Sequence, residues 1–333
     1  MFCGQIVSCC SSSILIAMAT KWVKNCDGKL EEHNNSDTTV AVDRISKLPD
    51  AVIHHILSFG PTVYAVRMSL LSRRWRRMWY SVPTLRFSEL DGFHCRESLD
   101  VFVEQCLIHR SVATRYIADS AVTSFKLYVC FGTDIGRPPV NRWSKSPIIR
   151  NDVMQLDIYG SGYYLHCLGD EDYRPSVALS GRSLSIVKLG GVKLDDSCST
   201  NLPSLKSLCL DDVTFDNDVN DTLRNLMIGC PSLEKFVFKV PRASYFVEIK
   251  ISSSSLKLLE IETGIQTVDI DALNLQSLVV QSFGCSQICF SSCTAIRDLS
   301  LCGLRDGNGP NFAEQICKLT CLENLTLETF GSA

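Results

Sequence analysis

The stretch LPSLKSLCLDDVTF, residues 202–215, decides the fold of this chain. Its centre has the form L-x-x-L-x-L, with leucines at positions 205, 208 and 210. Because side chains alternate along a strand, Leu208 and Leu210 fall on one face, and Leu205 turns inward at the corner before the strand. A single unit of this kind cannot bury its own apolar face, so the pattern predicts neighbouring units that cover it.

The same six-residue pattern recurs through most of the chain. Its occurrences begin at Val153, Leu184, Leu205, Leu233, Leu256, Leu275, Ile296 and Leu322, and successive starts lie 19 to 31 residues apart. This strand pattern with a period of about 20–29 residues is typical of leucine-rich-repeat arrays. An ordinary β domain with alternating strands is the competing interpretation, and eight matches at such spacing disfavour it. We therefore expect a horseshoe-like α/β solenoid over residues 123–333, with the strands lining a concave surface.

The segments between the strands predict how the chain returns to the start of the next unit. Residues 218–227 and 311–319 have apolar side chains at helical spacing. The segment ETGIQTVDIDALN, residues 262–274, is short and polar, which predicts an extended path or tight turns. The array ends just after a strand with no polar capping unit, so the last repeat is expected to expose apolar surface, as in a truncated or alternatively spliced product.

The sequence before the array predicts helices. An amphipathic helix is expected at residues 98–110, within a helical linker at 89–122, and VTSFKLYV at 122–129 predicts the first strand of the array. Residues 43–82 predict three short helices, the second capped by Thr62 and the third by Ser72. So small a module cannot bury all of its tryptophans and aliphatic side chains, so a partner or the rest of the chain must cover them.

The helical module at residues 43–88 resembles an F-box in the form common in plants, on the residues Leu48-Pro49-Asp50, Ile53, Ile56-Leu57, Val66-Arg67, Leu71-Ser72, Arg74-Trp75 and Trp79. Members of that family dock a Skp-family adaptor, which links them to a cullin-based ubiquitin ligase. The resemblance implies that the adaptor-binding surface is formed or supported by Leu48, Pro49, Ile53, Ile56, Leu57, Val66, Leu71 and Trp75. With the connector at residues 136–151 and segments such as CPSLEKF, the resemblance extends to plant F-box/leucine-rich-repeat proteins, without the extra C-terminal domain of many relatives. The implied fold class is α+β.

The basic run RRWRR, residues 73–77, raises the question of nucleic-acid binding. Arginines interleaved with aromatic residues can stack on bases. However, the formal net charge of the whole chain is −3, and the spacing of Trp75 and Trp79 is explained by packing. We therefore expect no nucleic-acid partner, and the arginines should line the outer face of an amphipathic helix.

Seventeen cysteines invite a metal or disulfide interpretation, but their number is odd and no pair is spaced C-x-x-C. The best metal candidates, Cys285, Cys289 and Cys293, lie in a Ser- and Gly-rich stretch that is a poor helix former. We expect buried free thiols, no metal and no cofactor. Free thiols indicate a reducing compartment, the cytoplasm or the nucleus. No apolar run approaches the roughly 20 residues of a membrane span.

The first 42 residues have no periodic apolar pattern and are expected to be disordered. The sequence that follows Met18 resembles an ordinary cytosolic N-terminus, so translation from Met18 is one hypothesis. Motifs of catalysis, such as G-x-S-x-G and H-E-x-x-H, are not found in the sequence, and no enzyme activity is expected.

The sequence predicts a substrate-recognition subunit of a Skp–cullin–F-box type ubiquitin ligase, in which the repeat array holds a target protein. Two alternatives remain open: a leucine-rich-repeat receptor for a hormone or other ligand, and a scaffold that is not assembled into a ligase. The target-binding residues are expected at the concave side or its rim, at Lys206, Ser207, Glu234, Lys235, Gln276, Arg297 and Glu323.

Overall fold

The structure is a computed structural model, and it describes residues 47–93, 96–113, 121–130, 149, 151–161, 176–177, 179, 181–194, 201–215, 218–239, 245–304 and 311–329. The expected disordered segment 1–42, the choice of Met18 and most of the connector at 136–151 lie outside these residues. The chain divides into two units, residues 1–126 and 127–333, which are described separately. In the described part, no helix is long and apolar enough to cross a membrane.

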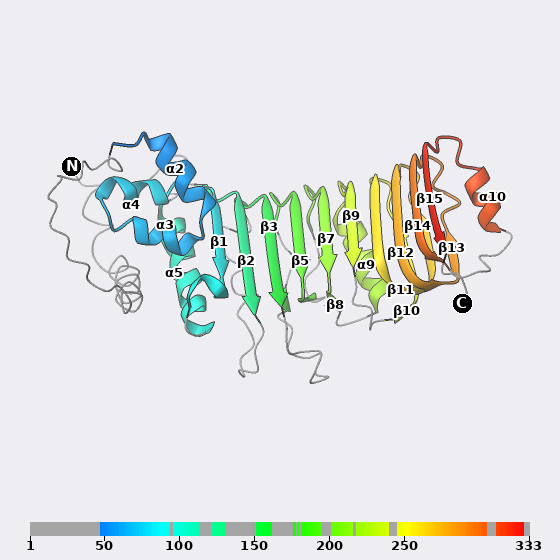
Figure 1. Cartoon of the computed structure of the whole chain (residues 1–333), viewed down its shortest axis with the longest axis horizontal. Helices are drawn as coiled ribbons and strands as arrows, with labels where there is room; N and C mark the ends of the chain where they lie inside the picture. The colour runs from blue at the N-terminus through cyan, green and yellow to red at the C-terminus, as the bar shows by residue number, and fades with distance from the viewer. Residues whose placement is uncertain are drawn as a thin grey trace, which may run out of the picture. The chain divides into compact units, whose positions relative to one another are not determined.

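The first unit begins with the three predicted short helices, α2 (Asp50–Phe59), α3 (Thr62–Met68) and α4 (Arg73–Trp79) (Figure 1). Ser72 caps α4 as expected, since its side chain accepts a hydrogen bond from the backbone N–H of Trp75 at 3.2 Å. Thr62 does not cap α3, because Pro61 occupies that position. The Thr62 hydroxyl instead accepts the backbone N–H of Arg86 at 2.8 Å, which ties α3 to the strand that follows the helices.

The rest of the first unit covers the large side chains of the helical module. It comprises β1 (Thr84–Ser88), the short 3-10 helix η3 (Glu89–Asp91), α5 (Arg96–Ala113) and the start of β2 (Ser124–Cys130), which crosses into the second unit. The ring of Phe87 in β1 lies 6.0 Å from that of Phe102 in α5 and 5.6 Å from that of Phe125 in β2. Trp79 is only 2% exposed, so residues of this chain cover it and no partner is needed to do so.

The second unit is built on parallel strands that follow one another in chain order. These are β3 (Gln155–Ser161), β5 (Ile186–Gly190), β7 (Ser207–Asp211), β9 (Lys235–Lys239), β11 (Leu258–Asp271), β12 (Ser277–Cys285), β14 (Asp298–Leu304) and β15 (Asn324–Thr329). Each begins two residues after the start of one of the eight sequence patterns, so every predicted strand is confirmed (Figure 1). The mixture of helices and strands agrees with the predicted α+β class.

The leucines of the pattern form the core of this unit. In the repeat that begins at Leu205, the side chains of Leu205, Leu208 and Leu210 are all 0% exposed. The last pattern differs, because Leu325 and Leu327 of β15 are 46% and 44% exposed. Apolar side chains are therefore exposed on β15.

Several return segments also form strands. β11 is long enough to serve two sheets: Leu258–Thr263 pairs with β9 and β12, and its second half pairs with β10 (Tyr245–Ser252) and β13 (Gln287–Cys289). The segment predicted as extended or turning is thus extended. A further small sheet contains β4 (Ser176–Val177), β6 (Lys193–Leu194) and β8 (Thr214–Phe215).

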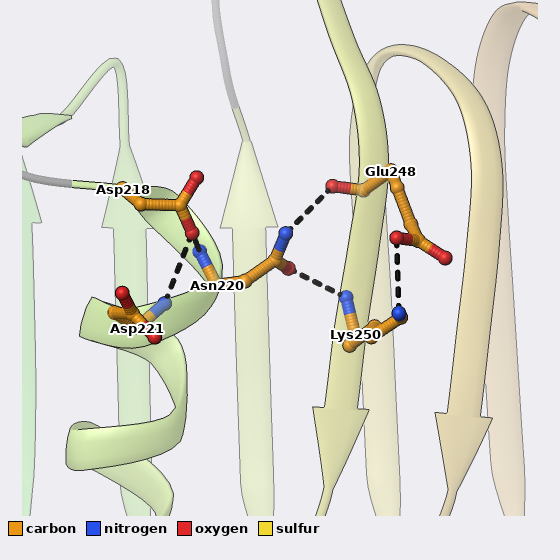
Figure 2. A network of polar contacts seen from close by, with 5 residues as sticks. All are labelled: Asp218, Asn220, Asp221, Glu248 and Lys250. Carbon is orange, nitrogen blue, oxygen red and sulfur yellow. Dashed lines mark hydrogen bonds and ion pairs between the residues drawn. The ribbon is translucent and has the colours of Figure 1, made fainter.

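Two return segments are helical, as predicted. α9 (Val219–Gly229) starts at Asp218, whose side chain accepts the backbone N–H groups of Asn220 and Asp221, and it packs on β10 (Figure 2). α10 (Asn311–Cys317) ends two residues before the predicted segment 311–319 does, and it contacts β13. Both helices thus pack on strands of the second sheet, which contains β10, β13 and the second half of β11.

Candidate interaction surfaces

The outer face of α2 carries an apolar stripe that nothing in the described residues covers. Val52, Ile56 and Phe59 are spaced four and three residues apart, and they are 40%, 40% and 70% exposed. We call these three residues the α2 stripe. Leu71, in the turn before α4, is 64% exposed as well. A small module that leaves so many large apolar side chains in solvent has the character of a docking surface.

The structure divides the predicted adaptor-binding residues into two groups. Pro49, Ile56 and Leu71 are exposed and Leu48 is half-buried, so these four can take part in a contact. The other four are at most 4% exposed and form the core that holds the helices together: Ile53, Leu57, Val66 and Trp75. Their role can only be to support the surface.

Sequence reasoning missed Val52 and Phe59. The signal was present, because positions 52, 56 and 59 form a second helical stripe beside the buried one at Ile53 and Leu57. Two apolar stripes on one short helix, one of them turned outward, distinguish a docking helix from an ordinary core helix.

Polar contacts fix α2 against its neighbours. The Arg74 Nε donates to the Asp50 carboxylate at 2.6 Å, and its guanidinium also contacts the carbonyl oxygen of Leu48. His54 has its Nε2 at 2.6 Å from the carbonyl oxygen of Ser81, a contact that ties α2 to the residues after α4. The remaining arginines of the basic run, Arg73, Arg76 and Arg77, are exposed on α4.

The second unit presents a row of backbone hydrogen bonds just before its strands. We call this the entry row, and it consists of Ser185, Lys206, Glu234, Lys257, Gln276, Arg297 and Glu323. The carbonyls of the first six residues in the row each accept two N–H groups from the next repeat; that of Lys206, for example, accepts those of Glu234 and Lys235, both at 2.9 Å. The backbone alone therefore holds the row in register.

Five of the seven predicted target-binding residues fall in the entry row: Lys206, Glu234, Gln276, Arg297 and Glu323. The other two, Ser207 and Lys235, are the first residues of β7 and β9 and are register partners. The structure thus brings all seven to the same edge of the sheet, where each is exposed or half-exposed. Whether they bind a target stays a prediction.

Sequence reasoning missed Lys257, the one charged member of the entry row that it did not name. Its ammonium lies 3.3 Å from the Glu234 carboxylate, and Arg297 pairs with Glu323 at the same distance. These pairs are largely in solvent, so each contributes little to stability, about 0–1 kcal/mol. They remain available to exchange partners with a bound protein.

A second row crosses the sheet near the ends of the strands. We call it the exit row, and it consists of the register partners Tyr159, Gly190, Asp211, Lys239, Glu262, Gln281, Cys302 and Glu328. These residues were not predicted as site residues. The sequence signal was the alternation itself, because each lies beside a buried leucine or its equivalent and must point to the opposite face.

The electrostatics of the exit row centre on Lys239. Its ammonium pairs with Glu260 at 2.9 Å and with Glu262 at 3.2 Å, and these hydrogen bonds, the one to Glu260 first, raise the pKa of Lys239. Burial raises the pKa of Asp211, and the neighbouring Asp212 carboxylate raises it further. Burial also raises the pKa of Tyr159 to about 12, and Cys209 and Asp157 add to the effect.

Four cysteines of the described residues lie in the core as free thiols. Cys106, Cys230, Cys285 and Cys293 are buried, and burial raises the pKa of each of these thiols. Among the residues that the structure describes, no group of His, Cys, Asp and Glu side chains could hold a metal ion. A catalytic thiol would need the opposite, a lowered pKa.

Two family models match the sequence. The F-box domain matches residues 45–87, and the leucine-rich repeats of "FBD-associated F-box protein At5g56370" match residues 140–298. The first covers the module that carries the α2 stripe, and the second covers the strands from β3 to the start of β14.

Curated proteins of Arabidopsis thaliana are similar to about two thirds or more of this chain. "FBD-associated F-box protein At4g10400" is 32% identical over 67% of this chain and 51% of its own length. "Putative F-box/LRR-repeat protein At5g02930" is 31% identical over 68% of this chain and 43% of its own length, and "F-box/LRR-repeat protein At2g42720" is 30% identical over 73% and 53%. The chain thus spans about half the length of the curated relatives it matches.

Proposed function

Because this chain belongs to the F-box/leucine-rich-repeat family of plant proteins, we propose that it is the substrate-recognition subunit of a Skp–cullin–F-box type ubiquitin ligase. In this proposal the first unit docks a Skp-family adaptor, and through it a cullin. The second unit holds a target protein. The chain itself performs no catalytic step.

The observation that carries the proposal is the α2 stripe. Ile53 and Leu57 fill the module's own core from one side of α2, whereas Ile56 and Phe59 point outward. Burying a side chain of this size against a partner is worth about 1.5–3 kcal/mol. A few such anchors at the centre of an interface supply most of its binding energy.

The exposed arginines of α4 support the same reading. Residues 43–90 carry eight basic and three acidic side chains, whereas the chain as a whole has a formal net charge of −3. A positive module accelerates the approach of an acidic partner surface, and it does so less at high salt. The Skp-family surface expected here is therefore apolar at its centre and acidic at its rim.

We infer that the repeats stack as a solenoid whose first sheet faces the target. Two binding surfaces on one frame would place lysines of the target near a ubiquitin-conjugating enzyme held by the cullin. Such placement acts by raising the effective concentration of the reacting groups. No step of the chemistry then depends on a side chain of this protein.

A pull-down of the full chain with a purified Skp-family adaptor tests the proposal. The double variant Ile56→Asp with Phe59→Asp should lose the adaptor, because it places two carboxylates at the centre of the contact. Ile228→Asp is the matched control, since Ile228 is 72% exposed on α9 in the other unit, and it should retain binding. Adaptor binding that survives the double variant would remove the basis of the proposed function.

A further inference from the structure

Two tyrosine rings form a flat aromatic surface on the second unit. Tyr128, in the second half of β2, stacks on Tyr159 of β3 with ring centroids 5.5 Å apart and planes within 7° of parallel. Both side chains are half-exposed. Exposed tyrosine faces offer a large contact area at little cost in conformational entropy, and they attract cations.

Gly190 allows Tyr159 to lie in this position. Gly190 is the register partner of Tyr159, and a Cβ on it would lie 2.4 Å from Cδ1 of the tyrosine ring. The ring therefore lies against the backbone of β5. Asp211 follows Gly190 in the exit row. Because glycine has no side chain, no other side chain of the row lies between the Tyr159 ring and the Asp211 carboxylate.

Asp211 supplies a negative charge at the end of this surface. Two strand spacings separate its backbone from that of Tyr159, about 10 Å, and its charge acts on the tyrosine hydroxyl. Lys239, which follows Asp211 in the row, is shared by Glu260 and Glu262. This end of the exit row thus carries more negative than positive charge.

We propose that Tyr128, Tyr159 and Asp211 bind an arginine side chain presented by the target protein, with the guanidinium stacked on Tyr159 and paired with Asp211. This inference rests on the proposed function, since it names the chemistry of what the second unit holds.

Arginine fits this surface better than other side chains do. Its guanidinium is planar, so it can stack on an aromatic face while its edge donates two hydrogen bonds to a carboxylate. A lysine ammonium is a compact, strongly hydrated point charge and gains less from the flat face. An acidic side chain would be repelled by Asp211.

The test uses three libraries of displayed twelve-residue peptides, random except for a fixed central arginine, lysine or glutamine. Each library is selected against the purified full chain. The arginine library should yield binders enriched about tenfold over the other two, and Asp211→Asn should weaken those binders about three- to tenfold. Equal enrichment from the arginine and lysine libraries, or from all three, overturns the inference.

Variants of the aromatic surface separate ring stacking from general effects on folding. Tyr159→Ala should weaken the selected peptides as much as Asp211→Asn does, whereas Tyr159→Phe should retain them within about twofold because the ring remains. Gly190→Ala retains both tyrosine residues, but its added methyl group displaces the Tyr159 ring, so this variant should also weaken binding. Gln281→Ala, an exposed position further along the exit row, is the matched control.

Thermal melting of each variant accompanies the binding measurement, and Asp211→Asn provides the decisive comparison if Tyr159→Ala unfolds, because Asp211 is exposed. Binders that ignore both Asp211→Asn and Gly190→Ala show that the surface is elsewhere. All of these variants should still bind the Skp-family adaptor. A wild-type chain that selects arginine peptides but does not bind the adaptor would refute the proposed function and leave this surface standing.

Discussion

The Asn220 side chain hydrogen-bonds the backbone of β10 beside Lys250, as a neighbouring strand would. Its side-chain oxygen accepts the backbone N–H of Lys250 at 2.8 Å, and its amide nitrogen donates to the carbonyl of Glu248 at 3.1 Å (Figure 2). One amide side chain at the start of α9 therefore satisfies two backbone groups at the edge of β10. An edge strand closed in this way is a poor template for pairing with another chain.

Replacing Asn220 by alanine should lower the free energy of unfolding by about 1–2 kcal/mol, because both backbone groups of β10 lose a partner and one stays partly buried. Urea denaturation followed by circular dichroism measures the change. Arg224→Ala is the control, since it removes only an exposed ion pair with Asp221 and should cost less than about 0.5 kcal/mol. Equal losses for the two variants would contradict this role of Asn220.

Gln315 of α10 makes the same pair of contacts with β13, and its loss should cost more. Its side-chain oxygen accepts the backbone N–H of Phe290 at 2.7 Å, and its nitrogen donates to the carbonyl of Ile288 at 3.3 Å. Because Gln315 is buried, Gln315→Ala should lower the free energy of unfolding by about 2–3 kcal/mol, which urea denaturation also measures. A smaller loss than that of Asn220→Ala would show that burial does not set the size of the effect.

Arg110 holds the C-terminal end of α4, and Arg110→Met should destabilise the first unit by about 2–4 kcal/mol. The guanidinium is fully buried, donates to the carbonyls of Trp79 at 2.7 Å and Val82 at 2.8 Å, and lies 5.6 Å from the centre of the Trp79 ring. Burial lowers the pKa of Arg110 to about 10. Thermal melting followed by tryptophan fluorescence reports the loss.

The matched control for Arg110 is Arg77→Met on the exposed face of α4, which should shift the melting temperature by less than about 2 °C. Arg110→Lys should rescue only part of the loss, because an ammonium cannot reproduce the two-pronged donor geometry. Full rescue by lysine would show that the charge matters and the geometry does not.

Neighbouring residues of α2 should separate stability from adaptor binding. Ile53→Ala removes a side chain that is 0% exposed and should cost about 2–4 kcal/mol of stability. Ile56→Ala removes one that is 40% exposed, so it should cost under about 1 kcal/mol of stability but weaken the adaptor at least tenfold. Calorimetric melting and adaptor titration of the same two proteins give both values.

The buried thiol of Cys230 should make stability fall as pH rises above about 9. Burial raises its pKa from 9.0 to about 12, so between these two pH values the unfolded chain releases a proton that the folded chain retains. The stabilising difference is complete below pH 9 and is lost as the pH approaches 12. Melting temperatures measured from pH 8 to pH 10.5 should therefore decline.

Cys230→Ala tests the assignment, because it should flatten the decline relative to the wild type after correction for its own packing cost. Alkylation by iodoacetamide at pH 8 provides a second check. Cys317 and Cys321 are exposed and should react first, whereas the buried Cys230 and Cys293 should react only on unfolding. Rapid alkylation of Cys230 in the folded protein would contradict its burial.

The strands could be predicted from the sequence because their signal is local and repeated. Leu205, Leu208 and Leu210 are buried, and so are the equivalent residues of every other repeat except the last, so one correctly predicted repeat predicts its neighbours. α9 was equally legible, since Asp218 and the apolar spacing after it lie within a few residues. The repeat pattern and the helix cap can each be recognised within a short stretch of sequence.

The features that sequence reasoning missed depend on residues far apart in the chain. The Thr62 hydroxyl was expected to cap a helix, but it serves β1, 24 residues later. The exit row required the register of eight strands, which no single pattern contains. Phe59 was passed over because a periodic apolar residue is assigned to the core by default, and only the packing of α3 and α4 shows which stripe the core uses.

The carbonyls of the entry row from Ser185 to Arg297 each accept two N–H groups of the following repeat, and no side chain takes part in these bonds. A change of residue type in this row therefore leaves the frame intact, provided that the newcomer is not proline. Lys206 or Arg297 can therefore be replaced without loss of the backbone hydrogen bonds that join the repeats. The backbone hydrogen bonds hold the repeats together, and the side chains of the entry row are free to vary.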